Sequence, residues 1–150
     1  MTTLEILRQE IADTNIRLDE FHLPHAVSMS HMDEDGDCFI AIDRWQIATS
    51  AEEEVRLLHE MGHCKTGSFY CEHTAIDRRG YHENKATRWA IRRRLPIERL
   101  RAAIQHCRPH NDYELAEHLG LTVEFVRVAI QYYTETLGLV LAKGIERGEL

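Results

Sequence analysis

The chain has 150 residues, and its 43% hydrophobic and 29% charged content is ordinary for one globular domain. Its longest apolar runs, such as LGLVLA near the C-terminus, are far too short to span a bilayer. The start MTTLEILRQEI is polar and acidic, unlike a signal peptide, so we expect a cytoplasmic protein that does not enter the membrane.

The net charge of −7 is unevenly distributed along the chain. Residues 1–60 carry −10, residues 61–110 carry +7 and residues 111–150 carry −4. The positive charge comes largely from RWAIRRRLPIERLR at 88–101. Such a run is most often a solvated helix face, and the sharper hypothesis is a patch that docks an acidic protein or lies near nucleic acid.

The first 43 residues predict a helix followed by a small sheet. Apolar residues recur at helical spacing over 3–15. Three segments with strand character follow, two of them flanking the hairpin turn signal Asp35-Gly36. These segments are NIRLDEF (15–21), AVSMSHM (26–32) and CFIAID (38–43). Three short antiparallel strands are the simplest arrangement for them.

A longer helix is expected next. Ser50 and Glu53 form a capping box ahead of an apolar run. Thr49 and Glu52 offer the alternative register, and the helix should end near Gly67. The segment 68–82 has the composition of a loop.

Four further helical segments complete the chain. They are ENKATRWAIRRRL (83–95), PIERLRAAIQHC (96–107), DYELAEHLG (112–120) and VEFVRVAIQYYTETLG (123–138). Pro96 ends the first of them, and Asn111 and Thr122 cap the last two. The order of elements predicts an α+β fold.

The stretch LLHEMGHCKTG (57–67) carries the chemistry. His59 and His63 are four residues apart, so both imidazoles can face one metal ion from a helix. Glu60 points about 100° away from His59, which lets its carboxylate reach a metal-bound water without binding the ion. This HExxH pattern is typical of zinc-dependent hydrolysis, in which zinc lowers the pKa of water and the glutamate accepts its proton. Two histidines without a metal are the plain alternative.

Gly62 has a plausible purpose in such a helix. A glycine costs a helix about 1 kcal/mol relative to alanine, so something should compensate. We expect Gly62 to let another backbone approach the metal helix closely.

A catalytic zinc normally has three protein ligands and one open position. The extended pattern HExxHxxGxxH is not met, because Thr66 and Phe69 occupy the glycine and third-histidine places. Glu83, at the start of the next expected helix, is the best candidate for the third ligand. His82 and His73 are weaker candidates.

The four cysteines show no CxxC spacing, so in the cytoplasm we expect free thiols. They are Cys38, Cys64, Cys71 and Cys107. A structural zinc site that uses Cys64, Cys71 and His73 is a weaker alternative.

HEMGH followed by ENKATRWAIRRRLP resembles the ImmA/IrrE family of small zinc metallopeptidases, which has HExGH and then a glutamate that opens a helix ending in proline. The matching positions are Glu83, Ala86, Trp89, Ala90 and Pro96. IAID…TSAEEEV and YELAEHLGLTVEFVRVAIQYY are similar to the short forms found in prophages and integrative elements of Gram-positive bacteria. The resemblance covers about residues 20–135. Thr87 departs from it, since many members carry asparagine there.

The resemblance implies a small gluzincin-like fold. It also implies that the protein cleaves a repressor protein encoded nearby. His59, His63 and Glu83 would bind Zn²⁺, with Glu60 as general base. We expect a single metallopeptidase domain, in which residues 1–97 hold the sheet and active-site helices and 98–150 form a helical C-terminal subdomain. A donor to the oxyanion is also needed. The candidates are Tyr70, Tyr81, His73 and His82.

Two alternatives remain open. YELAEHLGLTVEFVRVAI has the apolar spacing of a helix-turn-helix with Gly120 in the turn, which would suit a DNA-binding regulator. The would-be recognition helix offers a single arginine, Arg127, in an acidic region, so direct nucleic-acid binding is disfavoured. The other alternative is a repressor antagonist that does not cleave and holds a structural zinc. CFIAID could pair with an extended substrate, and the tail after Gly138 has no counterpart in the family.

Overall fold

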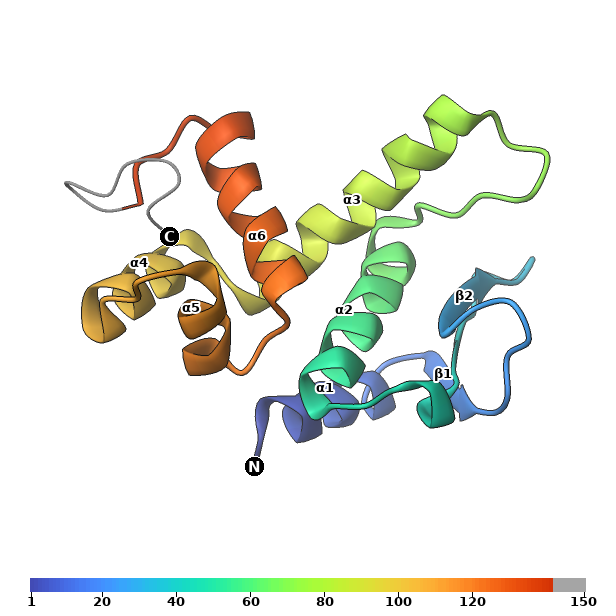
Figure 1. Ribbon diagram of the computed structural model, residues 1–150. Helices are drawn as coiled ribbons and strands as arrows, with labels where there is room; N and C mark the ends of the chain where they lie inside the picture. The colour runs from blue at the N-terminus through green and yellow to red at the C-terminus, as the bar shows by residue number, and fades with distance from the viewer. Residues whose placement is uncertain (142–150) are drawn as a thin grey trace. The chain divides into compact units, whose positions relative to one another are not determined.

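The computed structural model describes residues 1–141, which form six α-helices and a three-stranded mixed sheet (Figure 1). The α+β class is therefore as expected, while the gluzincin-like fold stays a prediction. The chain divides into two compact units, the first Met1–Ala90 and the second beginning at Ile91. The predicted domain organisation stays a prediction. Within residues 1–141, no helix combines the length and apolar character needed to cross a bilayer.

The first unit contains the sheet and the two helices that carry the HExxH pattern and Glu83. Its elements are α1 (Thr3–Ala12), β1 (Ile16–Glu20), β2 (Ser28–Met32), β3 (Cys38–Ile42), the 3₁₀ turn η1 (Arg44–Gln46), α2 (Ser50–Thr66) and most of α3 (Ile76–Arg94). Thr49 caps α2 by accepting from the Glu52 N–H, so the alternative capping register is the one adopted. Gly67 ends the helix in a left-handed conformation at φ 64°, as expected.

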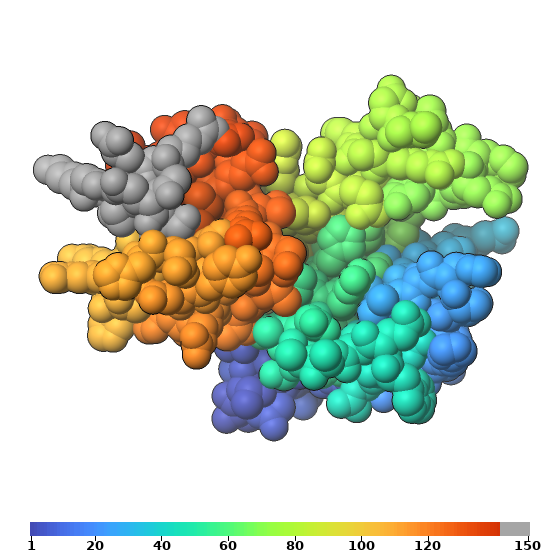
Figure 2. All heavy atoms as spheres, in the orientation of Figure 1, coloured from blue at the N-terminus to red at the C-terminus, as the bar shows by residue number. Residues whose placement is uncertain are grey.

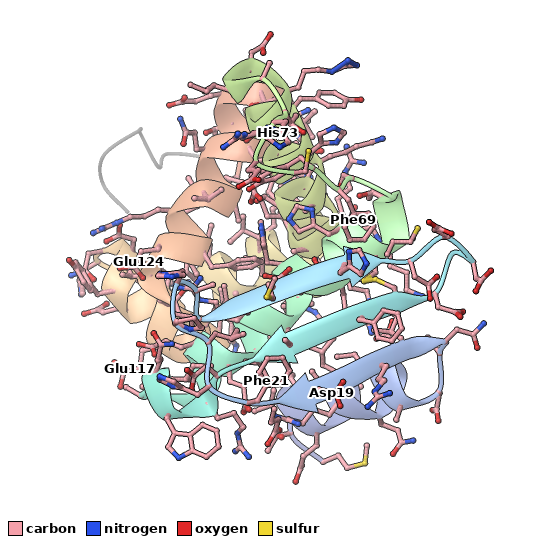
Figure 3. The ribbon with its side chains drawn as sticks, turned by 90° about the vertical axis from the view of Figure 1, so that its right-hand side faces the viewer. Asp19, Phe21, Phe69, His73, Glu117 and Glu124 are labelled. Atoms are coloured by element: carbon pink, nitrogen blue, oxygen red, sulfur yellow. A yellow bond between two sulfur atoms is a disulfide. The ribbon has the colours of Figure 1, made fainter. Side chains whose placement is uncertain are left out.

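The sheet has the order β1-β3-β2, with β3 in the middle (Figure 3). The predicted β2–β3 hairpin is present, but β1 pairs with β3 in parallel, so the prediction of three antiparallel strands is wrong. The central strand is the most apolar of the three, and Ile40 and Ile42 are fully buried. An apolar strand is best buried when strands pair with it on both sides. β1 therefore pairs with the edge of β3 that β2 leaves open. Both edges of β3 are thus occupied, so CFIAID cannot accept a substrate strand.

The helix α3 begins earlier than expected. It starts at Ile76, so the prediction of a loop is wrong for residues 76–82. Glu83 consequently lies about two turns inside the helix rather than at its start. The large apolar residues of this first part of α3, Ile76 and Tyr81, are both exposed. This part therefore lacks the regularly spaced apolar residues from which a helix is predicted.

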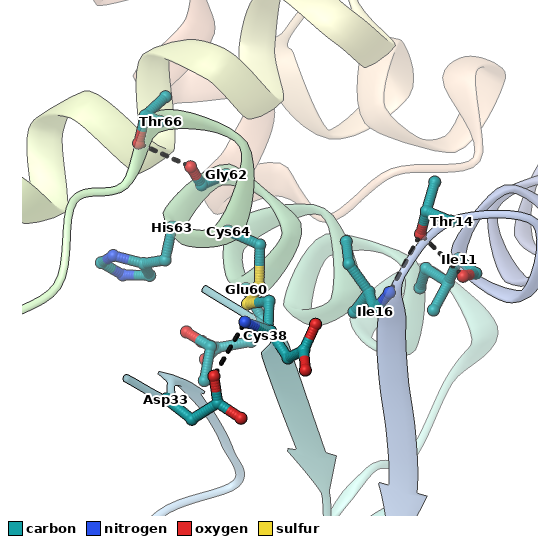
Figure 4. Close-up of a disulfide and its surroundings, with 12 residues drawn as sticks. Ile11, Thr14, Ile16, Asp33, Cys38, Glu60, Gly62, His63, Cys64 and Thr66 are labelled. Atoms are coloured by element: carbon teal, nitrogen blue, oxygen red, sulfur yellow. Dashed lines mark hydrogen bonds between the residues drawn. A yellow bond between two sulfur atoms is a disulfide. The ribbon is translucent and has the colours of Figure 1, made fainter. Parts of the chain in front are cut away.

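Cys38 and Cys64 form a disulfide that joins the start of β3 to the end of α2 (Figure 4). The expectation of free thiols is therefore wrong for this pair, while Cys71 and Cys107 are free. Packing of α2 on the sheet brings the two Cα atoms to 5.9 Å, although 26 positions separate them in sequence. No short spacing pattern marks such a pair.

The second unit is helical. Its elements are α4 (Ile97–Cys107), α5 (Asp112–Leu119), α6 (Val123–Gln131) and the π-helical turn η2 (Tyr132–Thr136). Asn111 and Thr122 cap α5 and α6, and Gly120 ends α5 at φ 66°, as the sequence predicted. The core contains apolar residues from every helix of the unit. Examples are Leu100, Ile104, Leu115, Val126 and Tyr133.

Two of the clustered arginines of the basic run have partners within the second unit. Arg92 donates to the Tyr132 hydroxyl from Nε at 2.8 Å. Arg94 is buried and donates to the Leu119 carbonyl at 3.0 Å. These contacts favour a structural role for this part of the run over a free docking patch. Most of the tail after Gly138 lies outside the described residues.

Candidate metal centre

Three candidate ligands from two helices meet in the first unit. His59 and His63 lie in the C-terminal half of α2, and Glu83 lies in α3. The His59 Nε2 is 2.7 Å from Glu83 Oε2 and 3.2 Å from His63 Nε2, and His63 Nε2 is 3.3 Å from Glu83 Oε1. One potential ligand atom from each residue lies within 4.8 Å of the others. The structure thus brings together the three residues that the sequence singled out as ligands.

Gly62 explains how the two helices come so close. A Cβ atom at this position would lie 2.4 Å from the carbonyl oxygen of Ala86 in α3, a distance that non-bonded atoms do not adopt. Only glycine leaves room for the backbone of α3, one turn after Glu83. The expectation that Gly62 permits close approach to the metal helix is confirmed.

The surroundings of the imidazoles fit a metal site. His63 Nδ1 is 2.5 Å from the Ser68 carbonyl, which can only accept, so this nitrogen carries the proton and Nε2 is free to bind an ion. Thr87 Oγ1 lies 3.4 Å from His59 Nδ1. Thr87, the departure from the family pattern, therefore contacts a candidate ligand. Two imidazoles and one carboxylate form a ligand set that suits zinc.

The electrostatics of the cluster favour a cation. Hydrogen bonds from His59, His63 and Tyr70 hold the pKa of Glu83 well below its usual range, against the opposing effect of burial. Burial by itself lowers the pKa of His63, but Glu83 and the Ser68 carbonyl more than offset it, so the pKa is raised. Three hydrogen-bonding groups thus direct protons at the Glu83 carboxylate. A divalent ion that bound there would displace protons from the two imidazoles.

Glu60 lies beside the three candidate ligands but is not one of them. Its side chain is only 6% exposed, and its two carboxylate oxygens accept from the Ser28 hydroxyl at 2.9 Å and the Ser30 hydroxyl at 2.6 Å. The sequence interpretation missed both serines. The alternation in SMS was the available signal, since residues two apart in a strand share a face.

A cavity of about 260 Å³ contains this cluster. It is lined by the three candidate ligands and Glu60, by Ser28–Ser30 of β2, and by Phe69 and Tyr70 from the loop before α3. In Figure 2 this loop (yellow-green) and the β2–β3 hairpin (blue) lie on either side of the end of α2 (green). The cavity is therefore bordered by the sheet edge on one side and by a loop on the other.

Tyr70 is the only one of the four proposed oxyanion donors that lines the cavity. Its hydroxyl donates to Glu83 Oε1 at 2.7 Å, and this bond, together with burial, raises the pKa of Tyr70 to about 12. His82 stacks on Tyr70, and Tyr81 is largely exposed. His73 is exposed in the loop before α3 (Figure 3).

The alternative zinc site at Cys64, Cys71 and His73 is wrong. Cys64 is bound to Cys38 (Figure 4), so its sulfur is not available as a thiolate ligand. Within residues 1–141, the group of His59, His63 and Glu83 is the one arranged to hold a metal ion.

Comparisons of the chain with protein-family models, with curated proteins and with solved structures found no match.

Proposed function

We propose that the protein is a zinc-dependent endopeptidase that hydrolyses a peptide bond in a regulatory protein. The observation that carries this proposal is the convergence of His59, His63 and Glu83, with the buried carboxylate of Glu60 beside them, in one cavity. Three ligands and an adjacent carboxylate are the groups that metal-assisted hydrolysis requires.

The side chains divide the work of the reaction. A bound zinc ion would polarise the scissile carbonyl and lower the pKa of the attacking water toward about 7. Glu60 accepts the proton of that water and later delivers it to the nitrogen of the leaving amine. Tyr70, on the cavity wall, would exchange its hydrogen bond to Glu83 for one to the oxygen on which negative charge develops. Ser68 keeps the His63 ring in the tautomer that a metal ligand needs.

The substrate is an extended segment of another protein. Within the described sheet β2 pairs only with β3, so its other edge offers unpaired backbone groups next to the cavity. A peptide that added to this edge would be held by main-chain hydrogen bonds and would pass the candidate metal ligands. In line with the family resemblance, we propose a cytoplasmic repressor encoded nearby as the source of this segment.

The helix-turn-helix hypothesis gains little support from the second unit. Arg127, the one arginine of the would-be recognition helix α6, is paired with Asp112 of α5 and lies over the ring of Tyr113. A side chain that is engaged in this way has to break two contacts before it can bind a phosphate.

Co-expression with candidate repressors tests the proposal. The wild type should release fragments detectable by mass spectrometry, whereas Glu60→Gln should slow cleavage by about 10²–10⁴-fold, because the proton acceptor is lost. Glu72→Gln, the same change at a highly exposed position, should cleave normally. All three proteins should bind one zinc by metal analysis.

Two outcomes would contradict the proposal. Equal cleavage by wild type and Glu60→Gln would exclude Glu60 as the base. Partners that stay intact with every version, yet lose repression, would point to an antagonist that does not cleave.

A further inference from the structure

The two serines that contact Glu60 come from one short strand. Ser28 and Ser30 occupy alternate positions of β2 and present their hydroxyls to different oxygens of the same carboxylate. The strand is held in register by β3, where Ser28 lies opposite Ile42 and Ser30 lies opposite Ile40. The hydroxyls are therefore fixed by the sheet, not by α2, the helix that carries Glu60.

This arrangement solves a problem that the candidate ligands create. Although the helix turns Glu60 about 100° from His59, its side chain lines the same cavity, and a carboxylate is itself a good zinc ligand. If it bound the ion, it would occupy the position that catalysis needs open. Burial of the side chain adds to the difficulty, because a buried carboxylate without donors is strongly driven toward any nearby cation.

We propose that Ser28 and Ser30 are positioning residues, which hold the Glu60 carboxylate beside the metal centre and prevent it from binding the ion. The inference rests on the proposed function. Two hydrogen bonds satisfy both carboxylate oxygens with neutral donors, so no cationic side chain is needed to hold the group in place. The same strand offers its free edge to the substrate, so β2 would align the peptide and the base together.

Cobalt substitution tests this directly, because the positions of the visible absorption bands of Co²⁺ depend on the ligands that the ion has. We expect the bands of the Ser28→Ala/Ser30→Ala variant to be shifted from those of the wild type, because the Glu60 carboxylate replaces water as the fourth ligand. It should also bind Co²⁺ about tenfold more tightly, because Glu60 becomes an additional protein ligand. Changes in the residues around metal ligands typically alter metal affinity by at least this factor. General damage to the site would instead weaken binding. Adding Glu60→Gln to this variant should restore the wild-type spectrum.

Two controls separate positioning from folding. Ser28→Thr/Ser30→Thr keeps both hydroxyls and should retain the wild-type spectrum. Ser50→Ala, the same chemical change at the exposed start of α2, should change nothing. If the double alanine variant does not fold, as judged by circular dichroism, each single variant should show part of the change.

The outcomes distinguish the inference from the proposed function. A wild type that binds one Co²⁺, together with alanine variants that match it in spectrum and affinity, would overturn the role of the serines alone. A wild type that binds no Co²⁺ would overturn the metal centre and the inference with it.

Discussion

The two halves of α2 both bury carboxylates but give them different partners. In the N-terminal half, Glu53 is 5% exposed and is paired with Arg8 and Arg44. In the C-terminal half, Glu60 is equally buried but accepts from the hydroxyls of two serines. The charge of Glu53 is neutralised by two cations, which stabilises the fold, whereas the two serine partners of Glu60 are neutral and would leave its charge for the proposed chemistry. The partners, more than the burial, distinguish the two roles.

The largest expected effect concerns the disulfide that links the C-terminal half of α2 to the sheet. The disulfide from Cys64 to Cys38 closes a sequence separation of 26, so its removal in Cys38→Ala/Cys64→Ala should lower the free energy of unfolding by about 3.5 kcal/mol. Denaturant titration with and without a reducing agent measures this. A Cys71→Ser/Cys107→Ser variant should keep the reductant sensitivity of the wild type. Four titratable thiols in the unreduced, denatured wild type would show that the bond is absent.

The stabilisation of the protein by zinc should distinguish Glu60 from the three candidate ligands. At a free concentration of 100 times its Kd, it should raise the free energy of unfolding of the wild type by about 2.7 kcal/mol. Glu60→Gln should show a similar rise at the same free zinc concentration, because this residue is outside the ligand group. Under the wild-type conditions, Glu83→Gln should lose most of the rise. Thermal unfolding across a zinc series checks this, and an unchanged response in Glu83→Gln would remove it from the ligands.

Replacing Glu53 and Glu60 of α2 by glutamine, one at a time, tests whether the different partners of the two carboxylates matter for stability. Glu53→Gln should lower the free energy of unfolding by about 2 kcal/mol more than Glu60→Gln, because the neutral amide removes the buried negative charge that Arg8 and Arg44 share. Serine hydroxyls can rotate to accept from the new amide. Chemical denaturation of both variants measures the difference. Equal losses would mean that the type of partner does not matter.

Gly62→Ala should give the smallest loss in this series. Contact with the Ala86 backbone should cost about 3 kcal/mol, and the better helix propensity of alanine should return about 1 kcal/mol. Gly80→Ala in α3 is the matched control, because a Cβ there meets nothing within 4 Å and should stabilise the helix. Thermal unfolding of both variants checks the opposite signs. A stabilised Gly62→Ala would show that the helices lie farther apart.

Local patterns predicted much of what is found along the chain. The capping residues Asn111 and Thr122, the glycine ends of α2 and α5, and the β2–β3 hairpin all depend on interactions within a few residues. The start of α3 escaped prediction, because its first turns are exposed and carry no apolar stripe.

The sequence by itself determined the candidate chemistry of this protein, since helical periodicity already places His59 and His63 on one face, with Glu60 turned away from them. Only the tertiary structure decided what surrounds that chemistry. It set the parallel pairing of β1 with β3, the Cys38–Cys64 bond and the two serines on Glu60. Each of these joins segments that are distant in sequence, and such contacts depend on how whole elements pack together and not on the spacing of neighbouring residues.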